Sequence, residues 1–192
     1  MNKKKKIAIA IGIVLLAVGA YQIYNVYFNY RLMTITEGKV YKSGVIPPDK
    51  LDDFVEKYHI KSIIDLRGPV TTDLVNNPEN QTEISAEKEA TAGIPNLNYY
   101  NIPSQQVPSA ETLKKFYAVM DDKSNYPVLI HCYHGIGRAQ VYSAVYRIEY
   151  EGWSNEEARQ KAAFPVTFSS FDNGTPKGEF LKSYISRKDS VK

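Results

Sequence analysis

The segment VLIHCYHGIGRAQ spans residues 128–140 and contains the only cysteine of the chain, Cys132. It begins with an apolar run that is typical of a buried strand. Two glycines, Gly135 and Gly137, then predict a tight loop, because glycine adopts backbone conformations that other residues avoid. Arg138 follows, and the residues after it are apolar on all sides, which indicates a helix packed in the centre of a fold. The segment therefore predicts a strand, a loop and a helix around one cysteine.

Strands and helices alternate along the rest of the chain. The expected strands lie within residues 38–48, 60–68, 96–103 and 126–131. The expected helices lie within residues 49–59, 82–94, 104–122, 138–152, 154–164 and 178–188, and a loop is expected at residues 69–81. This alternation predicts an α/β fold with a central, mostly parallel sheet of roughly four to five strands flanked by helices. Ligands bind beyond the carboxyl ends of such strands, which is where Cys132 lies.

The first 31 residues differ in composition from the rest. Lysines occupy positions 3–6, and residues 7–28 form a mainly apolar stretch that is long enough to cross a membrane as one helix. Aromatic residues near its end would lie at the far interface of the membrane. The basic start, the apolar core and the small residues around Gly19 also fit a cleaved secretory signal. Residues 1–31 are therefore interpreted as a membrane anchor, with a cleaved signal as the alternative.

Both interpretations predict the same location for the body of the protein. The lysines stay in the cytoplasm, and the rest of the chain crosses the membrane. We expect a single-pass protein of the inner (cytoplasmic) membrane, with a catalytic domain at residues 38–188 that faces a bacterial periplasm. If the signal is cleaved, the domain is secreted to the periplasm instead.

Composition excludes several classes of protein. The 192 residues are 43% hydrophobic and 23% charged, which is normal for a globular protein. The net charge of +3 is smaller than the four positive charges of the N-terminal lysines, so the body gives no case for nucleic acid. One cysteine cannot form a disulfide framework or a multi-cysteine zinc site. His131 and Cys132 are neighbours on a strand and would point to opposite faces, so we expect no metal site there.

The loop after Cys132 predicts a site for an anion. Successive N–H groups of such a loop can turn inward, and the helix that begins at Arg138 adds its positive N-terminal end. The planar guanidinium of Arg138 can hold two oxygens of a phosphate at once. The same positive field favours the thiolate of Cys132, which is the nucleophilic form of the side chain. The sequence therefore predicts a phosphate bound above a reactive sulfur.

The pattern H-C-x-x-G-x-x-R at residues 131–138 resembles the active-site loop of the cysteine-dependent protein tyrosine and dual-specificity phosphatases. Residues 40–68, which end in Leu-Arg-Gly, are similar to the start of the small bacterial and fungal members. The segment VYRIEYEGWSNEEA is similar to the helix and glycine-tryptophan turn that follow their loop. The resemblance covers residues 38–163, and it implies a dual-specificity-phosphatase-like fold.

The resemblance also implies a reaction and a set of roles. Phosphomonoesters would be hydrolysed through a phosphocysteine intermediate, and neither a metal nor another cofactor is implied. Cys132 would attack phosphorus, Arg138 would bind the phosphoryl group, and His131 would hold the backbone of the cysteine. The phosphate oxygens would be held by the backbone amides of Tyr133, His134, Gly135, Ile136, Gly137 and Arg138.

The expected substrate is phosphotyrosine on a protein. Arg138 is the one cation in the sequence of the loop, whereas a substrate with many phosphates would require more positive charge. An inositol phosphate or another small phosphorylated molecule is the alternative within the same enzyme class.

Two residues depart from the family pattern. Ala139 stands where the family usually has the Ser or Thr that helps the sulfur leave, so breakdown of the intermediate should be slow. The family often takes its general acid from the loop after the preceding strand, and residues 102–109 contain no carboxylate. Asp73, Glu83 and Glu87 are other candidates for the acid. These departures leave open a phosphate-binding pseudophosphatase of weak activity.

Overall fold

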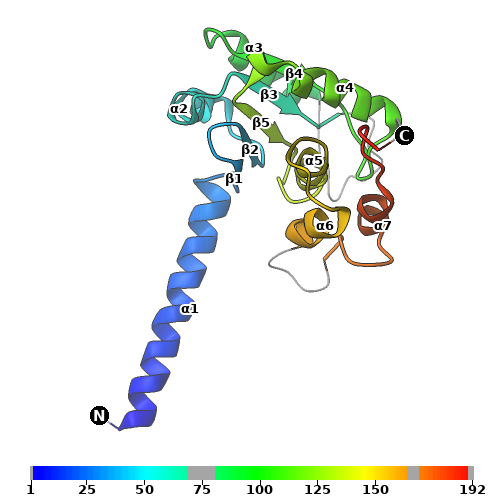
Figure 1. Ribbon diagram of the computed structural model, residues 1–192. Helices are drawn as coiled ribbons and strands as arrows, with labels where there is room; N and C mark the ends of the chain where they lie inside the picture. The colour runs from blue at the N-terminus through cyan, green and yellow to red at the C-terminus, as the bar shows by residue number, and fades with distance from the viewer. Residues whose placement is uncertain (1, 69–80, 164–168, 190–192) are drawn as a thin grey trace.

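The computed structural model describes residues 2–68, 81–163 and 169–189. The predicted loop at 69–81 and the candidate acid Asp73 lie, apart from Gln81, outside the described residues. The strands form one five-stranded sheet in the order β1-β2-β5-β3-β4 (Figure 1). They are β1 (Met33–Thr36), β2 (Val40–Ser43), β3 (Ser62–Asp65), β4 (Asn98–Asn101) and β5 (Val128–His131).

The sheet is mostly parallel, which confirms the predicted fold class. The pairs β2–β5, β5–β3 and β3–β4 are parallel, and only β1 runs antiparallel to its neighbour β2. Ser43, His131 and Asp65 are in register, so β2, β5 and β3 end at the same level of the sheet. The edge strand β1 was not predicted, because its four residues are exposed or half-buried and carry no strong apolar pattern.

Helices cover both faces of the sheet. The helices are α1 (Lys3–Tyr27), α2 (Pro48–Tyr58), α3 (Gln81–Ala92), α4 (Ala110–Asp121), α5 (Arg138–Tyr146), α6 (Asn155–Ala163) and α7 (Pro176–Ser183). Alternate strand residues point to opposite faces. Ile64 and Ile130 therefore pack in one apolar cluster with α4, α5 and α6, whereas Ile63 and Leu129 pack in a second cluster with α2.

Helix α5 is the centre of the larger cluster. All nine of its residues are buried, as its apolar sequence predicts. It begins directly after Gly137 and continues into a π-helical turn at Arg147–Glu151, which ends at Gly152. Its first turn therefore lies immediately after the loop that contains Cys132.

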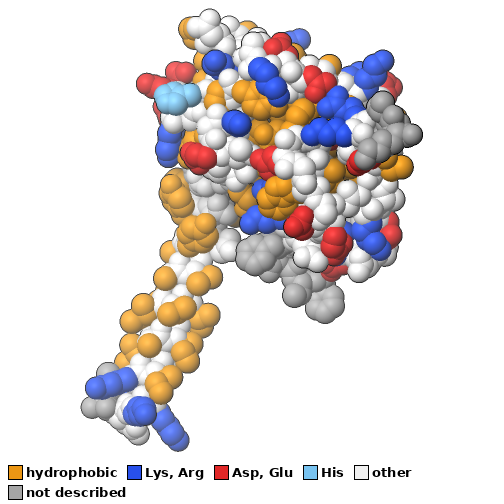
Figure 2. Space-filling view, in the orientation of Figure 1, with side chains coloured by type: hydrophobic (Ala, Val, Ile, Leu, Met, Phe, Trp, Pro, Cys, Tyr) orange, Lys and Arg blue, Asp and Glu red, His pale blue; other side chains and the backbone are white. Residues whose placement is uncertain are grey.

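Helix α1 extends away from the body as a single rod (Figure 1). None of its 25 residues is buried, and an 18-residue window has a mean hydropathy of 2.2. Figure 2 shows hydrophobic side chains along the rod and lysines at its free end. By length and composition, this helix can be a membrane span or a signal sequence.

Candidate active site

His131 is the last residue of β5 and Cys132 follows it directly, and their side chains lie on opposite faces of the sheet. The Cys132 side chain belongs to the apolar cluster around α5, and the residue is 3% exposed. Its sulfur accepts a hydrogen bond from the N–H of Gly135, with a distance of 3.3 Å between nitrogen and Sγ. At least one amide of the loop is therefore directed at the sulfur.

Three successive carbonyl groups of the loop are bound by donors from outside it. The bonds are Val45 N–H to Tyr133 O (3.0 Å), Arg31 Nη1 to His134 O (3.0 Å) and Lys42 Nζ to Gly135 O (2.9 Å). In a planar trans peptide the carbonyl and the following N–H point in opposite directions. Carbonyls held from outside therefore turn the next three N–H groups towards the inside of the loop. The hydrogen bond from Gly135 to the sulfur agrees with this orientation.

Glycine is required at two positions where backbones meet. Gly135 has a φ of +74°, and a Cβ at this residue would lie 2.4 Å from the nitrogen of Gly44. A Cβ on Gly44 would lie 3.1 Å from the carbonyl oxygen of Tyr133. Side chains at these positions would push the end of β2 away from the loop and disturb the bonds to its carbonyls.

Lys42 is a buried cation next to the sulfur. It lies opposite Ile130 in the parallel ladder between β2 and β5, and its residue is 2% exposed. Burial lowers the pKa of Lys42 to about 8, while the nearby Cys132 acts in the opposite direction and favours the charged form. Lys42 and Arg31 both bring positive charge to the loop from other parts of the chain, so the sequence of the loop alone does not reveal them. Arg138 is the one Lys or Arg within the loop, but the folded structure adds Lys42 and Arg31 to its surroundings.

Arg138 begins α5 and is 1% exposed. Its Nη1 donates to the carbonyl oxygen of Leu66 at 2.7 Å and to that of Ser104 at 3.5 Å. These two carbonyls follow β3 and β4, so the guanidinium is oriented by the ends of two neighbouring strands. The Ser104 hydroxyl in turn accepts a hydrogen bond from Tyr142 at 2.9 Å.

His131 belongs to a buried charge network on the other face of the sheet. Its Nε2 lies 2.9 Å from Oε1 of Glu87 and 3.6 Å from Oδ1 of Asp65. Arg67 forms ion pairs with both carboxylates. Burial alone would lower the pKa of His131, but Glu87 and Asp65 outweigh burial and raise it. The two carboxylates thus face one guanidinium and one imidazole, and they favour the protonated form of the imidazole.

Three side chains of this network are close enough together to hold a metal ion. The ligand atoms of Asp65, Glu87 and His131 lie within 4.8 Å of one another. Arg67 donates to both carboxylates inside this cluster, and its positive charge opposes a bound cation. We therefore interpret the cluster as a hydrogen-bonded charge network that fixes His131 next to Cys132.

The position expected for a general acid is occupied by an amide. In the loop after β4, Gln106 lies so close to the loop of Cys132 that a Cβ on Gly137 would be 2.9 Å from its Oε1. Lys177, at the start of α7, donates to this Oε1 at 3.2 Å. Among the candidate acids, Glu87 is held in the buried network, and Glu83 is exposed on α3.

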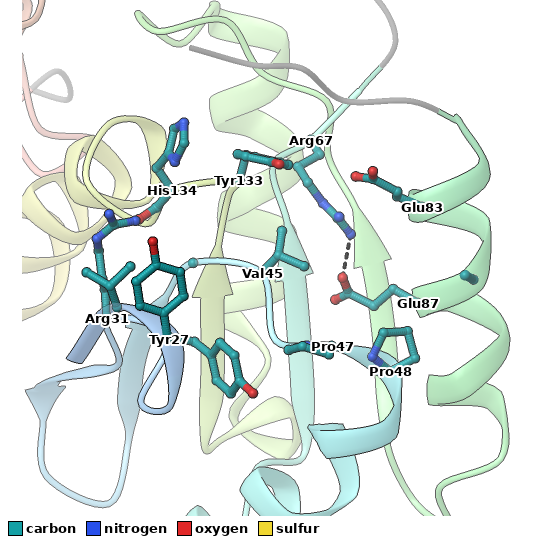
Figure 3. A pocket seen from close by; sticks show the side chains of 14 residues that line it. Tyr27, Arg31, Val45, Pro47, Pro48, Arg67, Glu83, Glu87, Tyr133 and His134 are labelled. Atoms are coloured by element: carbon teal, nitrogen blue, oxygen red, sulfur yellow. Dashed lines mark hydrogen bonds and ion pairs between the residues drawn. The ribbon is translucent and has the colours of Figure 1, made fainter. Parts of the chain in front are cut away.

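A cavity of about 610 Å³ lies beside the loop (Figure 3). Tyr133 and His134 form its wall on the side of the loop, and Tyr27 and Arg31 approach from the end of α1. The remaining walls come from the segment between β2 and α2 and from α3. This cavity thus joins the end of the apolar helix to the loop of Cys132.

Known proteins are similar to this chain in sequence and fold. A family model described as "DSP-PTPase phosphatase fused to NAD+ Kinase" matches residues 34–175. The core catalytic domain of the PP-IP phosphatase SIW14 from S. cerevisiae is 20% identical, with a TM-score of 0.56 over 80% of this chain and 85% of that chain. TpbA of P. aeruginosa is 16% identical, with a TM-score of 0.59 over 82% of this chain and 86% of that chain. A further structure of TpbA, as a variant, is a complex with pTyr.

A third solved structure extends this set. A mutant form of Tk-PTP is 18% identical, with a TM-score of 0.56 over 79% of this chain and 91% of that chain. A search of curated proteins found no match. At these identities the solved structures show a common fold, while the family model covers most of the chain and contains the Cys132 loop. The chain therefore belongs to the DSP-PTPase family, within the superfamily of cysteine-dependent phosphatases that residues 131–138 predicted.

Proposed function

We propose that the protein hydrolyses phosphomonoesters through a covalent intermediate on Cys132. The Cys132 sulfur attacks phosphorus, and the ester oxygen leaves with its electron pair. Arg138 and the backbone amides of residues 133–138 hold the phosphoryl oxygens as charge develops on them. The observation that carries this proposal is that residues outside the loop donate hydrogen bonds to three of its carbonyls, while the N–H of Gly135 is directed at the sulfur.

The second step restores the enzyme. Water attacks the phosphocysteine, the phosphorus–sulfur bond breaks, and the Cys132 thiolate and inorganic phosphate are formed. Ala139 offers no hydroxyl to stabilise the departing thiolate, so this step is expected to limit turnover. His131 precedes Cys132 directly and is held 2.9 Å from Glu87, and a positive charge on its ring would favour the negative charge of the sulfur.

Phosphotyrosine on a protein is the substrate that this site fits first. A phenolate leaves with less help from an acid than an alkoxide does, and Gln106 stands where an acid is expected. The complex of the similarly folded TpbA with pTyr supports the same choice.

A small molecule with several phosphates is the second candidate. Lys42 and Arg31 contact the loop, and Lys177 approaches it through Gln106, so the site has more positive charge than the loop sequence suggests. The similarly folded SIW14 is a PP-IP phosphatase, which also supports this candidate.

We also propose that α1 is an uncleaved anchor and that the body faces the periplasm of a bacterium. The helix has no buried residue to hold it on the body, and lysines precede its apolar part. A secreted form that follows signal cleavage is the alternative.

The test uses the full chain in detergent micelles and an aryl phosphate as substrate. Wild type should release phosphate, Cys132→Ser should release none, and Arg138→Lys should lose at least about 100-fold in kcat/KM, because one ammonium cannot replace a bidentate guanidinium. Arg147→Lys, a buried arginine on the same helical segment, is the matched control. Vanadate binding without turnover would instead indicate a phosphate-binding pseudophosphatase. Phosphate release that survives Cys132→Ser would refute the proposal.

A further inference from the structure

The chain leaves α1 through an unusual turn. Tyr30 and Arg31 have φ values of +51° and +53°, a left-handed conformation that is unfavourable for residues with a side chain. Arg31 N–H donates to Asn25 O at 2.7 Å, and the Asn29 side chain donates to Leu32 O at 3.2 Å. Strained backbone of this kind persists where the surrounding structure holds it in place, and it is found at functional sites.

This turn directs two groups at the loop of Cys132. Tyr30 O accepts the N–H of Gly44 at 2.7 Å, and Gly44 precedes the Val45 that binds a loop carbonyl. The half-buried Arg31 donates directly to His134 O, across 103 residues of sequence. The end of α1 therefore contacts the loop through one direct and one indirect path.

One peptide group connects Arg31 to the sulfur. Its carbonyl, on His134, accepts from Arg31 at 3.0 Å, and its N–H, on Gly135, donates to Cys132 Sγ at 3.3 Å. A cation on the carbonyl polarises the peptide and strengthens its N–H as a donor. Arg31 can therefore affect the sulfur and the bound phosphate without touching either.

Packing alone does not position Arg31. The cavity of about 610 Å³ lies between the last turn of α1 and the opposite wall at Pro48 and Glu83. Figure 3 shows Arg31 beside His134 at the edge of this cavity. The hydrogen bonds of the turn therefore set the place of the guanidinium together with Tyr30 and Leu32, which pack against the second apolar cluster.

We propose that Arg31 is a positioning residue of the active site, which orients the peptide between His134 and Gly135 and thereby the cradle for phosphate. This inference rests on the proposed phosphatase function and deepens it, because it makes the exit of the apolar helix part of the site. Lys42 holds the next carbonyl in the same way, so the loop is supported by one cation from β2 and one from the end of α1.

The test measures the full chain in detergent micelles with an aryl phosphate as substrate and vanadate as inhibitor. Arg31→Met keeps most of the apolar stem and removes the donor, and we expect it to weaken vanadate binding and kcat/KM by about tenfold or more. Arg31→Lys keeps a charge and a donor and should lose less, by roughly threefold. Lys50→Met, at an exposed cation of α2, is the control and should match wild type.

A pH profile separates positioning from a general loss of structure. If the Gly135 N–H is misdirected, the thiolate loses support, and the acid limb of kcat/KM should move to higher pH in the Arg31 variants. The inference would be overturned if vanadate affinity and kcat/KM stay within twofold of wild type and the acid limb of the pH profile does not move. If Arg31→Met does not fold, the Arg31→Lys variant decides by the same criteria. A wild type that neither hydrolyses the ester nor binds vanadate would refute the proposed function instead.

Discussion

At the scale of single residues, Lys42 shows how the site combines burial with charge. A lysine that is 2% exposed loses most of its hydration, which lowers its pKa to about 8. Two interactions compensate for this loss: the hydrogen bond to Gly135 O at 2.9 Å and the attraction of the Cys132 sulfur. The lysine therefore remains charged near neutral pH and supports both the loop and the thiolate.

This position predicts the alkaline limit of activity. Because the pKa of Lys42 is lowered to about 8, the side chain is cationic below that pH and loses its charge above it. Activity of wild type should fall as pH rises through about 8. Lys42→Arg keeps the charge and should move the limit to higher pH, while Lys42→Met should be weak at every pH. Lys39→Met, at an exposed lysine of the same hairpin, should leave the profile unchanged. If wild type and all three variants lose activity at the same alkaline pH, the role of Lys42 is contradicted.

The sequence predicts the reactive residues better than the residues that hold them. Cys132 and Arg138 were found because a short loop between a strand and a helix carries both. Lys42 has a weak signal, since its strand precedes a glycine and pairs with the strand of Cys132 only in the folded sheet. The sequence indicates the loop of Gln106 but not its contact with Gly137, and it gives no signal for Arg31, because both contacts join segments that are far apart in sequence.

At the scale of elements, local capping patterns were reliable and helix ends were less so. Ser109 caps α4 by accepting the N–H of Thr112, and Ser154 and Glu157 exchange the hydrogen bonds of a capping box, which is the pattern that a Ser three residues before a Glu favours. The last helix was expected at residues 178–188 but is α7, Pro176–Ser183. It ends early because the chain is extended at Tyr184, whose hydroxyl binds Glu149.

Helix α3 contributes Glu87 to the charge network, and we expect the ion pairs of Glu87 to stabilise the folded protein. Glu87→Gln leaves His131 and Arg67 without one of their two carboxylates, and we expect a loss of about 3 kcal/mol in the free energy of unfolding. Glu89→Gln, at an exposed residue of the same helix, should change it by less than about 0.5 kcal/mol. Urea unfolding followed by tryptophan fluorescence measures both. Equal stabilities would show that the network does not support the fold.

The pH dependence of this network has a defined sign. The folded state lowers the pKa of Asp65: burial opposes this, but His131 and Arg67 outweigh burial. It raises the pKa of His131 through Glu87 and Asp65. The lowered pKa of Asp65 adds to the free energy of unfolding above the ordinary pKa of ~3.9, and this contribution is lost as pH falls through the lowered value. The raised pKa of His131 adds to it below the ordinary pKa of ~6.5, and this contribution is lost as pH rises through the raised value. The effect of Glu87→Gln should therefore be largest between about pH 4 and 6.5.

At the scale of the whole molecule, an exposed apolar helix is attached to an enzyme-like body. The fold class followed from alternating strands and helices, but the path of the chain between α1 and the loop could not be predicted, because no residue pattern encodes that contact. If α1 is an anchor, the full-length protein should stay in the membrane fraction after an alkaline wash, and a protease should digest the body only from the periplasmic side. A shortened, soluble periplasmic product would favour signal cleavage, and a soluble full-length chain in the cytoplasm would exclude both.

The most direct test of the account is to trap the phosphoryl group on Cys132. Wild type mixed with an aryl phosphate and quenched within one turnover should carry one phosphoryl group on the peptide with Cys132, seen by mass spectrometry. Because Ala139 lacks a hydroxyl, the group should accumulate, and Ala139→Ser should reduce the trapped fraction while turnover rises. Phosphate release with no trapped group on Cys132, or with the group on another residue, would contradict the central claim.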